Sequence, residues 1–416
     1  MCPVACDQDR DGGRSVTTAS IQPVVFNPYD YDFHEDPYPT YRRLREEAPI
    51  YRNDELGFWA LSRHVDVSAA FRDAKRLSSA NGVSLDPAAY GPHAHKVMSF
   101  LAMDDPRHLR MRQLVSKGFT PRRVNEMRPR ITELTRQHLE PALESRNFDW
   151  ITEVAGKLPM DVISELMGVP QVDRAELRRL ADLVVHREEG VLDVPMPAME
   201  ASISLFTYYA DMLAQRRKNP GTDLISALLE AEIDGDRLSD NEIIGFMFLM
   251  VVAGNETTTK LLGNALFWAA RNPGEYAKVA ANPELVPEWV EETLRYDTSS
   301  QIVARTAAED IEYHGETMRA GDKVLILLGS ANRDDAVFDD GDAYTIGRSG
   351  KNALISFGAG PHFCLGAHLA RLEAVIALHE FASQVPAYGL EDSGIVRVHS
   401  TNVRGFANLP IELESN

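Results

Sequence analysis

Residues Phe357-Gly358-Ala359-Gly360-Pro361-His362-Phe363-Cys364-Leu365-Gly366 place one cysteine in a glycine-rich loop. The glycines give the backbone the freedom that close approach to a flat ligand requires, and Pro361 stiffens the turn. Apolar residues recur at helical spacing from Leu365 to Phe381, which predicts a helix directly after the loop. The Cys364 sulfur would then lie at a helix N-terminus, where an anion is favoured, so a thiolate at neutral pH is expected.

Three chemical roles compete for Cys364. A nucleophile needs a nearby base, and although His362 and His368 are close in sequence, neither belongs to a recognised protease or transferase signature. Zinc or an iron-sulfur cluster needs several ligands, and the other cysteines, Cys2 and Cys6, lie in a polar N-terminal tail. A haem iron needs only one thiolate. A buried structural cysteine would leave the glycines unexplained.

The pattern Phe-Gly-x-Gly-x-His-x-Cys-x-Gly closely resembles the cysteine loop of the cytochrome P450 family of haem-thiolate monooxygenases. The resemblance implies that Cys364 is the axial ligand of the iron of haem b. It also implies that Phe357 packs beneath the porphyrin, that His362 donates to a propionate, and that Gly358 and Gly366 belong to the cofactor-binding loop. Thiolate ligation favours cleavage of the O–O bond, and hydrogen bonds from loop amides to the sulfur would tune the potential.

A second segment, from Ser239 or Asp240 to Arg271, is predicted to be one long helix that stops at Asn272-Pro273. Such a helix would span about 50 Å. Its first half, residues 243–254, is apolar on every side, which indicates a helix through the centre of the protein. This apolar run is too short to cross a bilayer.

The apolar half of this helix ends in Ala253-Gly254-Asn255-Glu256-Thr257-Thr258. Gly254 lowers helix propensity, and the Thr257 hydroxyl can bond back to the Ala253 carbonyl, which would open the helix for a ligand or water. A kink with incidental polar packing is the alternative interpretation. The segment resembles the oxygen-binding helix of the P450 family, which implies that Ala253 and Gly254 contact the cofactor. Glu256 and Thr257 would then be the acid-alcohol pair that delivers protons to dioxygen.

Glu292-Thr293-Leu294-Arg295 lies in a predicted helix from about Pro287 to Tyr296. An acid and an arginine at this spacing share a helix face and can pair, although such pairs are usually solvated. In order and distance the four residues resemble the Glu-x-x-Arg pair of the family. The resemblance implies that Glu292 and Arg295 hold the acidic loop 332–344 against the haem side, as fold determinants and not as catalysts.

Propionates are the charged end of haem and need cationic partners inside the protein. His108 and Arg112 resemble the His-x-x-x-Arg pattern on an early helix of the family, and Arg305 resembles its arginine on a later strand. Each could alone be a surface charge. Together with His362, the resemblance gives a set of candidate propionate donors.

The chain has 416 residues and 44% hydrophobic content, a length that alone would suggest two or three domains. The resemblance runs from His108 to Gly366 and implies one haem-binding monooxygenase domain over residues 26–416, after a flexible tail over residues 1–25. Its fold would be mainly α with small β-sheets and a long central helix over the haem. A hairpin over residues 50–61, turning at Asn53 to Gly57, and a strand pair within residues 311–328 are expected.

Charge and composition restrict the partners and the compartment. The polar N-terminus predicts no signal peptide and no membrane anchor, and three cysteines without a disulfide framework suit a reducing compartment, so a cytoplasmic enzyme is expected. A net charge of -19 argues against nucleic acid as a partner. By contrast, the stretch from Arg107 to Arg123 is basic without any acid, and we expect the electron donor to dock there.

The function that the resemblance implies is a monooxygenase that inserts one atom of dioxygen into a hydrophobic small molecule. Fatty acids or other lipids, terpenoids, steroids and macrolide-like compounds all suit it, with medium or long lipids first. A separate ferredoxin and its NAD(P)H-dependent ferredoxin reductase would supply electrons. A non-catalytic haem-based sensor or carrier, and a peroxide-using haem enzyme of the same fold, are the alternatives. The substrate pocket is expected to involve residues 81–100, 191–209, 250–257 and 298–303.

Overall fold

The computed structural model describes residues 23–116, 118–233, 235–349 and 353–413, which form a mainly helical fold with small sheets, as predicted. Residues 1–22 of the predicted tail, with Cys2 and Cys6, lie outside the described residues. The helices are α1 (Tyr31–Glu35), α2 (Tyr38–Glu47), α3 (His64–Arg72), α4 (His95–Met98), α5 (Arg107–Ser116), α6 (Pro121–Glu126), α7 (Arg128–Ser145), α8 (Leu158–Met167), α9 (Gln171–Val185), α10 (Met196–Lys218), α11 (Leu224–Glu230), α12 (Asp240–Arg271), α13 (Pro273–Ala281), α14 (Val286–Tyr296), α15 (Leu328–Ala331) and α16 (Ala367–Ala382).

The strands among the described residues are short and fall into five sheets. They are β1 (Ile50–Asn53), β2 (Phe58–Leu61), β3 (Leu77–Ser78), β4 (Asn147–Asp149), β5 (Glu232–Ile233), β6 (Asp236–Arg237), β7 (Ile302–Ala307), β8 (Ile311–Tyr313), β9 (Glu316–Met318), β10 (Lys323–Leu327), β11 (Tyr388–Leu390), β12 (Val396–Arg397), β13 (Phe406–Asn408) and β14 (Pro410–Leu413).

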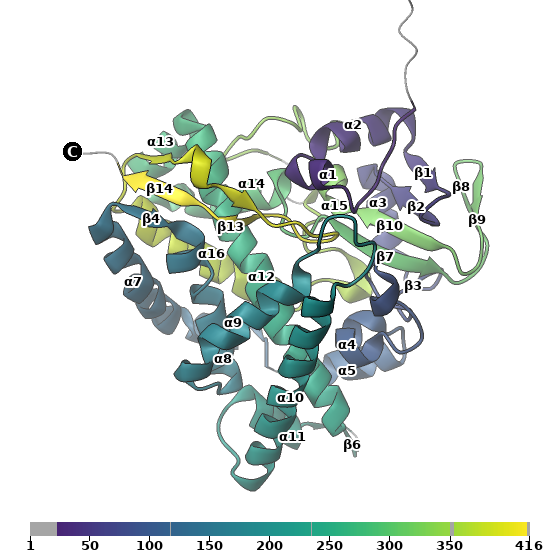
Figure 1. The fold of residues 1–416 in the computed structure, drawn as a ribbon, viewed down its shortest axis with the longest axis horizontal. Helices are drawn as coiled ribbons and strands as arrows, with labels where there is room; N and C mark the ends of the chain where they lie inside the picture. The colour runs from purple at the N-terminus through teal and green to yellow at the C-terminus, as the bar shows by residue number, and fades with distance from the viewer. Residues whose placement is uncertain (1–22, 117, 234, 350–352, 414–416) are drawn as a thin grey trace, which may run out of the picture.

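Helix α12 is the predicted long helix and spans 32 residues. A capping box fixes its start, because Ser239 accepts from the Glu242 amide while the Glu242 carboxylate accepts from the Ser239 amide. It ends at Asn272, where Pro273 begins α13. Figure 1 shows α12 crossing the middle of the molecule, with α7 to α9 on one side and the strands β1, β2, β7 and β10 on the other. The predicted central position is therefore confirmed.

The largest sheet has the strand order β1-β2-β10-β7-β3. Strands β1 and β2 form the predicted antiparallel hairpin, with Ile50 opposite Leu61 and with Gly57 at a positive φ of 66° in the turn. Strand β7 lies inside the sheet, paired with β10 on one side and with β3 on the other. Its backbone is therefore held from both edges.

The predicted strand pair within residues 311–328 is only half right. Strands β8 and β9 do form a hairpin, turning at His314 and Gly315, which both have positive φ as such a tight turn requires. Strand β10, however, joins the large sheet between β2 and β7. Its residues 324–327 are all buried, so both of its faces must be covered, which an isolated hairpin cannot provide.

Glu292 and Arg295 form a buried ion pair on α14, each with about 3% of its surface exposed. The Arg295 guanidinium donates to both carboxylate oxygens of Glu292, at 2.9 and 2.7 Å. It also donates to the backbone carbonyls of Asn332, Gly341 and Ala343 at 2.7 to 3.0 Å. These bonds hold the acidic loop 332–344 against α14, so the expected structural role is confirmed and the solvated-pair interpretation is wrong.

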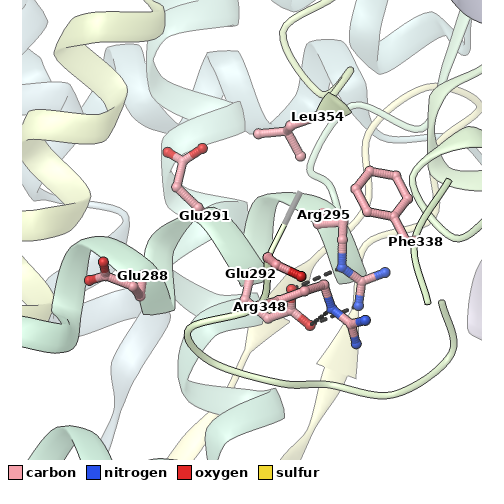
Figure 2. Close-up of a pocket in the computed structure, with 8 residues that line it drawn as sticks. Glu288, Glu291, Glu292, Arg295, Phe338, Arg348 and Leu354 are labelled. Carbon is pink, nitrogen blue, oxygen red and sulfur yellow. Dashed lines mark hydrogen bonds and ion pairs between the residues drawn. The ribbon is translucent and has the colours of Figure 1, made fainter. Parts of the chain in front are cut away.

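Further contacts complete this buried centre. Figure 2 shows Arg295 and Arg348 both turned toward Glu292, while Glu291 on the same helix points away. The Glu292 carboxylate accepts from the Thr345 amide at 2.8 Å and lies 3.4 Å from Arg348. The Glu292 carboxylate thus interacts with two guanidinium groups and one backbone amide, so its removal would leave several buried donors without a partner.

The buried apolar residues form one large cluster around α12 and two smaller clusters against the large sheet. Phe26 is the first fully buried residue of the described chain. Within the described ranges, no helix is long and apolar enough to cross a membrane.

Candidate active site

A large internal cavity separates α12 from the loop that carries Cys364. Its volume is about 260 Å³. Its wall includes most of the predicted site residues, among them Ala253, Gly254, Thr257, Arg112, Arg305, Phe357, Gly358, His362, Cys364 and Gly366. Residues from three of the four predicted pocket segments also line it. The segment 191–209 is fully described yet contributes nothing to this wall, so that part of the prediction is wrong for this cavity.

Two different structural requirements explain the glycines of the cysteine loop. Gly358 and Gly360 have positive φ of 68° and 67°. A Cβ on Gly360 would come within 2.7 Å of the Phe71 carbonyl oxygen, so the loop needs this glycine to pack against α3. A Cβ on Gly366 would instead meet nothing within 4 Å and faces the cavity. Gly358 and Gly366, which line the cavity, therefore fit the expected approach of a flat ligand, whereas Gly360 serves packing of the loop.

The Cys364 thiol faces the cavity, so a small molecule can reach it although protein surrounds it. Burial raises the pKa of the Cys364 thiol above its ordinary value. The amides of Gly366 and Ala367 and the guanidinium groups of Arg112 and Arg371 lower this pKa and offset the rise in part. The loop amides at the helix N-terminus thus favour the thiolate, as expected, while burial opposes it. A metal ion that binds the sulfur would deprotonate it outright.

Across the cavity, α12 presents Ala253, Gly254 and Thr257. The Thr257 hydroxyl donates to the Ala253 carbonyl at 2.8 Å, as predicted. A Cβ on Gly254 would make only ordinary contacts with Ile163, the nearest atom being 3.7 Å away. Packing against α8 thus does not require a glycine at this position, and its small size benefits the cavity side.

Glu256 does not line the cavity, although its neighbour Thr257 does. Its carboxylate lies 3.1 Å from the Lys260 ammonium, accepts from the Asn255 amide at 3.0 Å, and also bonds Asp182 of α9. Burial raises the pKa of Asp182 to about 8, and the nearby charge of Glu256 adds to this rise. Burial also acts on Glu256, but Lys260 and the hydrogen bond from Asp182 lower its pKa below the ordinary value. The predicted acid and alcohol are therefore on different faces of α12.

A cationic cluster of Arg112, Arg305, His108 and His362 lies at one edge of the cavity, where all but His108 line the wall and His108 packs against His362. The rings of His108 and His362 are 4.0 Å apart between centroids, and Nε2 of His108 and Nδ1 of His362 are buried without a hydrogen-bond partner. Arg305 is only 4% exposed and donates to the Ala304 carbonyl, with no carboxylate in ion-pair range among the described residues. Arg112 donates to the Phe363 carbonyl at 2.6 Å.

The pKa values of this cluster are lowered because its cationic groups are buried close to one another. Burial lowers the pKa of Arg305 to about 10. Burial and the charge of Arg305 lower the pKa of His362 to about 3, and burial lowers the pKa of His108 as well. Buried cations without carboxylates are costly unless an anion binds between them. The four predicted propionate donors thus lie together and have free donors to offer.

Comparisons with known proteins agree with this geometry. A family model described as cytochrome P450 matches residues 204–383. The chain is similar to a curated protein named putative cytochrome P450 123 from Mycobacterium tuberculosis, 62% identical over 392 residues that cover 94% of this chain and 98% of that protein. This chain belongs to the cytochrome P450 family. As an oxidoreductase of that family, this P450 uses haem as its cofactor.

This P450 also resembles relatives with named ligands or activities. It is 36% identical over 408 residues to a protein named vitamin D(3) 25-hydroxylase from Pseudonocardia autotrophica, covering 95% of this chain and 98% of the relative. The solved structure of CYP109E1 from Bacillus megaterium in complex with testosterone matches with a TM-score of 0.86 at 31% identity, covering 92% of this chain and 99% of that one. Both matches span nearly the whole fold.

The residues of the cavity fit a haem. A single thiol faces a wall of small residues on α12, and unpaired donors gather at one edge, where the two carboxylates of a haem would be neutralised. Among the described residues, no group of three or more His, Cys, Asp or Glu side chains could hold another metal ion. The donor set therefore suits one axial sulfur and one anionic edge.

Sequence reasoning missed three ionisable residues near the site. Lys260 and Asp182 pair with Glu256, and the spacing of Glu256 and Lys260 at i and i+4 was a visible signal for the first of these pairs. Glu373 of α16 lines the cavity, and burial raises the pKa of its carboxyl well above the ordinary value. Its signal was an acid on the buried, apolar side of α16, whose other acid, Glu380, lies in the last turn.

Proposed function

We propose that this P450 hydroxylates a hydrophobic small molecule with dioxygen and electrons from a separate ferredoxin and its NAD(P)H-dependent reductase. The observation that carries the proposal is the cavity bounded by Cys364 on one side, Thr257 on the other and the cationic cluster at its edge. Haem, when bound, activates dioxygen and supplies the oxidising chemistry. The protein binds and orients the reactants, excludes water and controls protons.

Each residue of the site has a defined task in this proposal. Cys364 ligates the iron, and the amides of Gly366 and Ala367 hold its sulfur. The cationic cluster binds the propionates through His108, Arg112, Arg305 and His362. The remaining predicted contacts pack against the flat faces of the cofactor, namely Phe357 and Gly358 on the sulfur side and Ala253 and Gly254 on α12.

Proton control belongs to α12 in this proposal. The Thr257 hydroxyl faces the cavity and holds its proton toward the Ala253 carbonyl, so a ligand in the cavity competes with that carbonyl for it. Glu256 lies one residue earlier, where Lys260 holds its carboxylate away from the cavity. Because its pKa lies below the ordinary value, Glu256 is ionised and stores no proton, so a proton that it passes on comes from Asp182, which bonds it and has a pKa of about 8. Opening of the ion pair with Lys260 would let Glu256 relay that proton toward Thr257, the alcohol that lines the cavity.

Replacing Thr257 by alanine is expected to leave haem content near normal and to lower the product formed per NAD(P)H consumed several-fold, with peroxide as the alternative product. The physical reason is that the hydroxyl is the group of the proposed pair that reaches the cavity. Thr257→Ser keeps the hydroxyl and is the matched control, which should stay close to the parent. Equal coupling in Thr257→Ala and the parent would exclude a role in proton delivery.

The residues that line the cavity indicate the class of substrate. Most lining residues outside the cationic cluster are apolar, which suits fatty acids and other lipids, terpenoids, steroids or macrolide-like compounds. The names of the relatives, one a vitamin D(3) hydroxylase and one bound to testosterone, favour polycyclic lipids within this range. Labelling with ¹⁸O₂ tests the function directly. One labelled oxygen atom per product, formed only with NAD(P)H and redox partners, is expected, whereas a sensor, a carrier or a peroxide-using enzyme would give none.

The surface over residues 107–123, where the ferredoxin is proposed to dock, has fewer unpaired positive charges than its sequence indicates. Arg110 and Arg122 pair with nearby carboxylates, and Lys117 lies outside the described residues. Arg123 on α6 is exposed and has no carboxylate partner among the described residues, and α6 packs against α16. Arg72 is exposed at the end of α3, where the Gly360 turn meets the α3 backbone. Arg72 and Arg123 thus replace Arg110, Lys117 and Arg122 as the residues to test.

Changing Arg72 or Arg123 to glutamate is expected to slow reduction by ferredoxin several-fold at low salt, because an exposed cation steers an acidic partner and salt screens the effect. Stopped-flow reduction across a salt series measures it. Lys218→Glu on α10 makes the same charge change far along the chain from the cysteine loop and should have no such effect. If all three variants were reduced at the same rate, the electron donor would dock elsewhere.

A further inference from the structure

The charged residues of the cavity wall indicate whether the substrate can carry a charged group. Besides Cys364 and the histidine of the cationic cluster, its ionisable lining residues are Arg112, Arg305 and Glu373. Both arginines belong to the cluster that the proposed function assigns to the haem propionates. Of the described lining residues, none offers a further cation. We infer that the substrate is uncharged over the part that enters the cavity, and that it carries a hydroxyl or carbonyl group that hydrogen-bonds to Ser300.

A free carboxylate would have no partner in this cavity. Away from the cluster the wall consists of side chains such as Phe100, Leu101, Leu249 and Met250. An ionised carboxylate there would lose its water without gaining a cation, which is costly. Glu373 does not change this, because burial raises its pKa well above the ordinary value and its Oε2 has no partner. Free fatty acids are therefore poor candidates, whereas alcohols, ketones, lactones and esters avoid the cost.

Ser300 is the most accessible of the polar wall residues that have no other role, because Thr258, Thr298 and Ser299 also line the cavity but are at most 5% exposed. It is half-buried, it lines the cavity, and its hydroxyl bonds no other described residue. Its backbone is fixed, because it bridges Val403 while the Ser299 carbonyl accepts from the Arg404 amide at 2.8 Å and the Gln301 amide donates to Asn402 at 2.8 Å. A hydroxyl on a fixed backbone and without an internal partner loses little conformational entropy when it hydrogen-bonds to one polar atom of a ligand.

Ser300 is also separated from the cationic cluster. It lies five residues before Arg305 on the segment that continues into β7. An extended chain covers about 16 Å over that distance. A ligand group at Ser300 therefore cannot share the hydrogen bonds of Arg305. The adjacent Ser299 hydroxyl is fully buried and unpaired, so it offers a matched control position.

The inference rests on the proposed function, and spin-state titration of the ferric holoenzyme tests it without turnover. Dodecan-1-ol and dodecanoic acid differ in the polar end only, and the alcohol is expected to bind at least about tenfold more tightly at neutral pH. Ser300→Ala should weaken binding of dodecan-1-ol about three- to tenfold, which is the size of one hydrogen bond, whereas Ser299→Ala should not. Tighter binding of the acid would overturn the uncharged substrate, and equal effects of both serine variants would overturn the role of Ser300.

A gain-of-charge variant tests the same point from the opposite direction. Met250→Arg places a cation in the apolar wall and should shift the preference toward dodecanoic acid, while Met250→Leu should keep the preference for the alcohol. An unchanged preference in Met250→Arg would contradict the charge argument. The reduced-CO spectrum separates failure of the proposed function from failure of the inference. Loss of the thiolate band in the parent protein would refute the haem-thiolate function itself. A normal band with a preference for the acid would refute only the inference about the substrate.

Discussion

Replacing Cys364 by histidine is expected to abolish the absorption band of a thiolate-ligated ferrous-CO complex while some haem stays bound. Imidazole donates less charge to iron than a thiolate does, so the spectrum must change if this residue is the ligand. The propionate cluster is untouched by the replacement and explains why haem is retained. A reduced-CO difference spectrum, together with haem content per chain, measures both effects.

His368→Ala is the matched control, because His368 is exposed and does not line the cavity. It should leave the CO spectrum unchanged, although it would remove one of the bases that a nucleophilic Cys364 could have used. An unchanged thiolate band in Cys364→His would rule out this cysteine as the axial ligand.

Replacing Glu292 by alanine is expected to lower the free energy of unfolding by about 3–5 kcal/mol, because it leaves the buried Arg295 without its partner. The loss should extend to haem binding, since the loop 332–344 would no longer be held against α14. Urea unfolding followed by circular dichroism gives the free energy, and haem retention during gel filtration gives the second effect.

Glu291→Ala changes the neighbouring residue on the same helix and serves as the control. Glu291 pairs with Arg371, but both side chains are partly exposed, at 23% and 33%. Removal of such a pair should cost about 1 kcal/mol or less. Equal destabilisation by the two variants would mean that burial of the Glu292 pair adds nothing to the fold.

Much of the site could be predicted because short-range chemistry determines it. The cysteine loop, the capped helix α12 and the hairpin of β1 and β2 all depend on residues that are neighbours in sequence, and the structure has each of them. The cationic cluster joins α5, β7 and the cysteine loop, and periodicity alone could not bring these together. The family resemblance supplied that long-range information.

The features that the sequence alone did not reveal concern where side chains point and which distant segments surround them. Glu256 points to Lys260 and Asp182 and not into the cavity that Thr257 lines, and Asp182 comes from a helix that the sequence pattern alone does not bring close. The pKa of Cys364 depends on burial by segments distant in sequence, and a helix N-terminus gives only one of its contributions. Strand β10 was misplaced because its partner β2 lies more than 200 residues earlier in the chain. Neutralisation of Arg110 by Asp236 is likewise invisible without the fold.

Strand β7 is held by a neighbouring strand on each edge, and the segment that leads into it carries Ser300 at one end and Arg305 at the other. If Ser300 anchors a substrate and Arg305 anchors the cofactor, one continuous piece of backbone acts as a ruler between the two molecules. Regioselectivity then depends on the length of the substrate measured from its polar atom, and not on the movement of a flexible loop. A homologous series of substrates should be oxidised at a constant number of bonds from that atom.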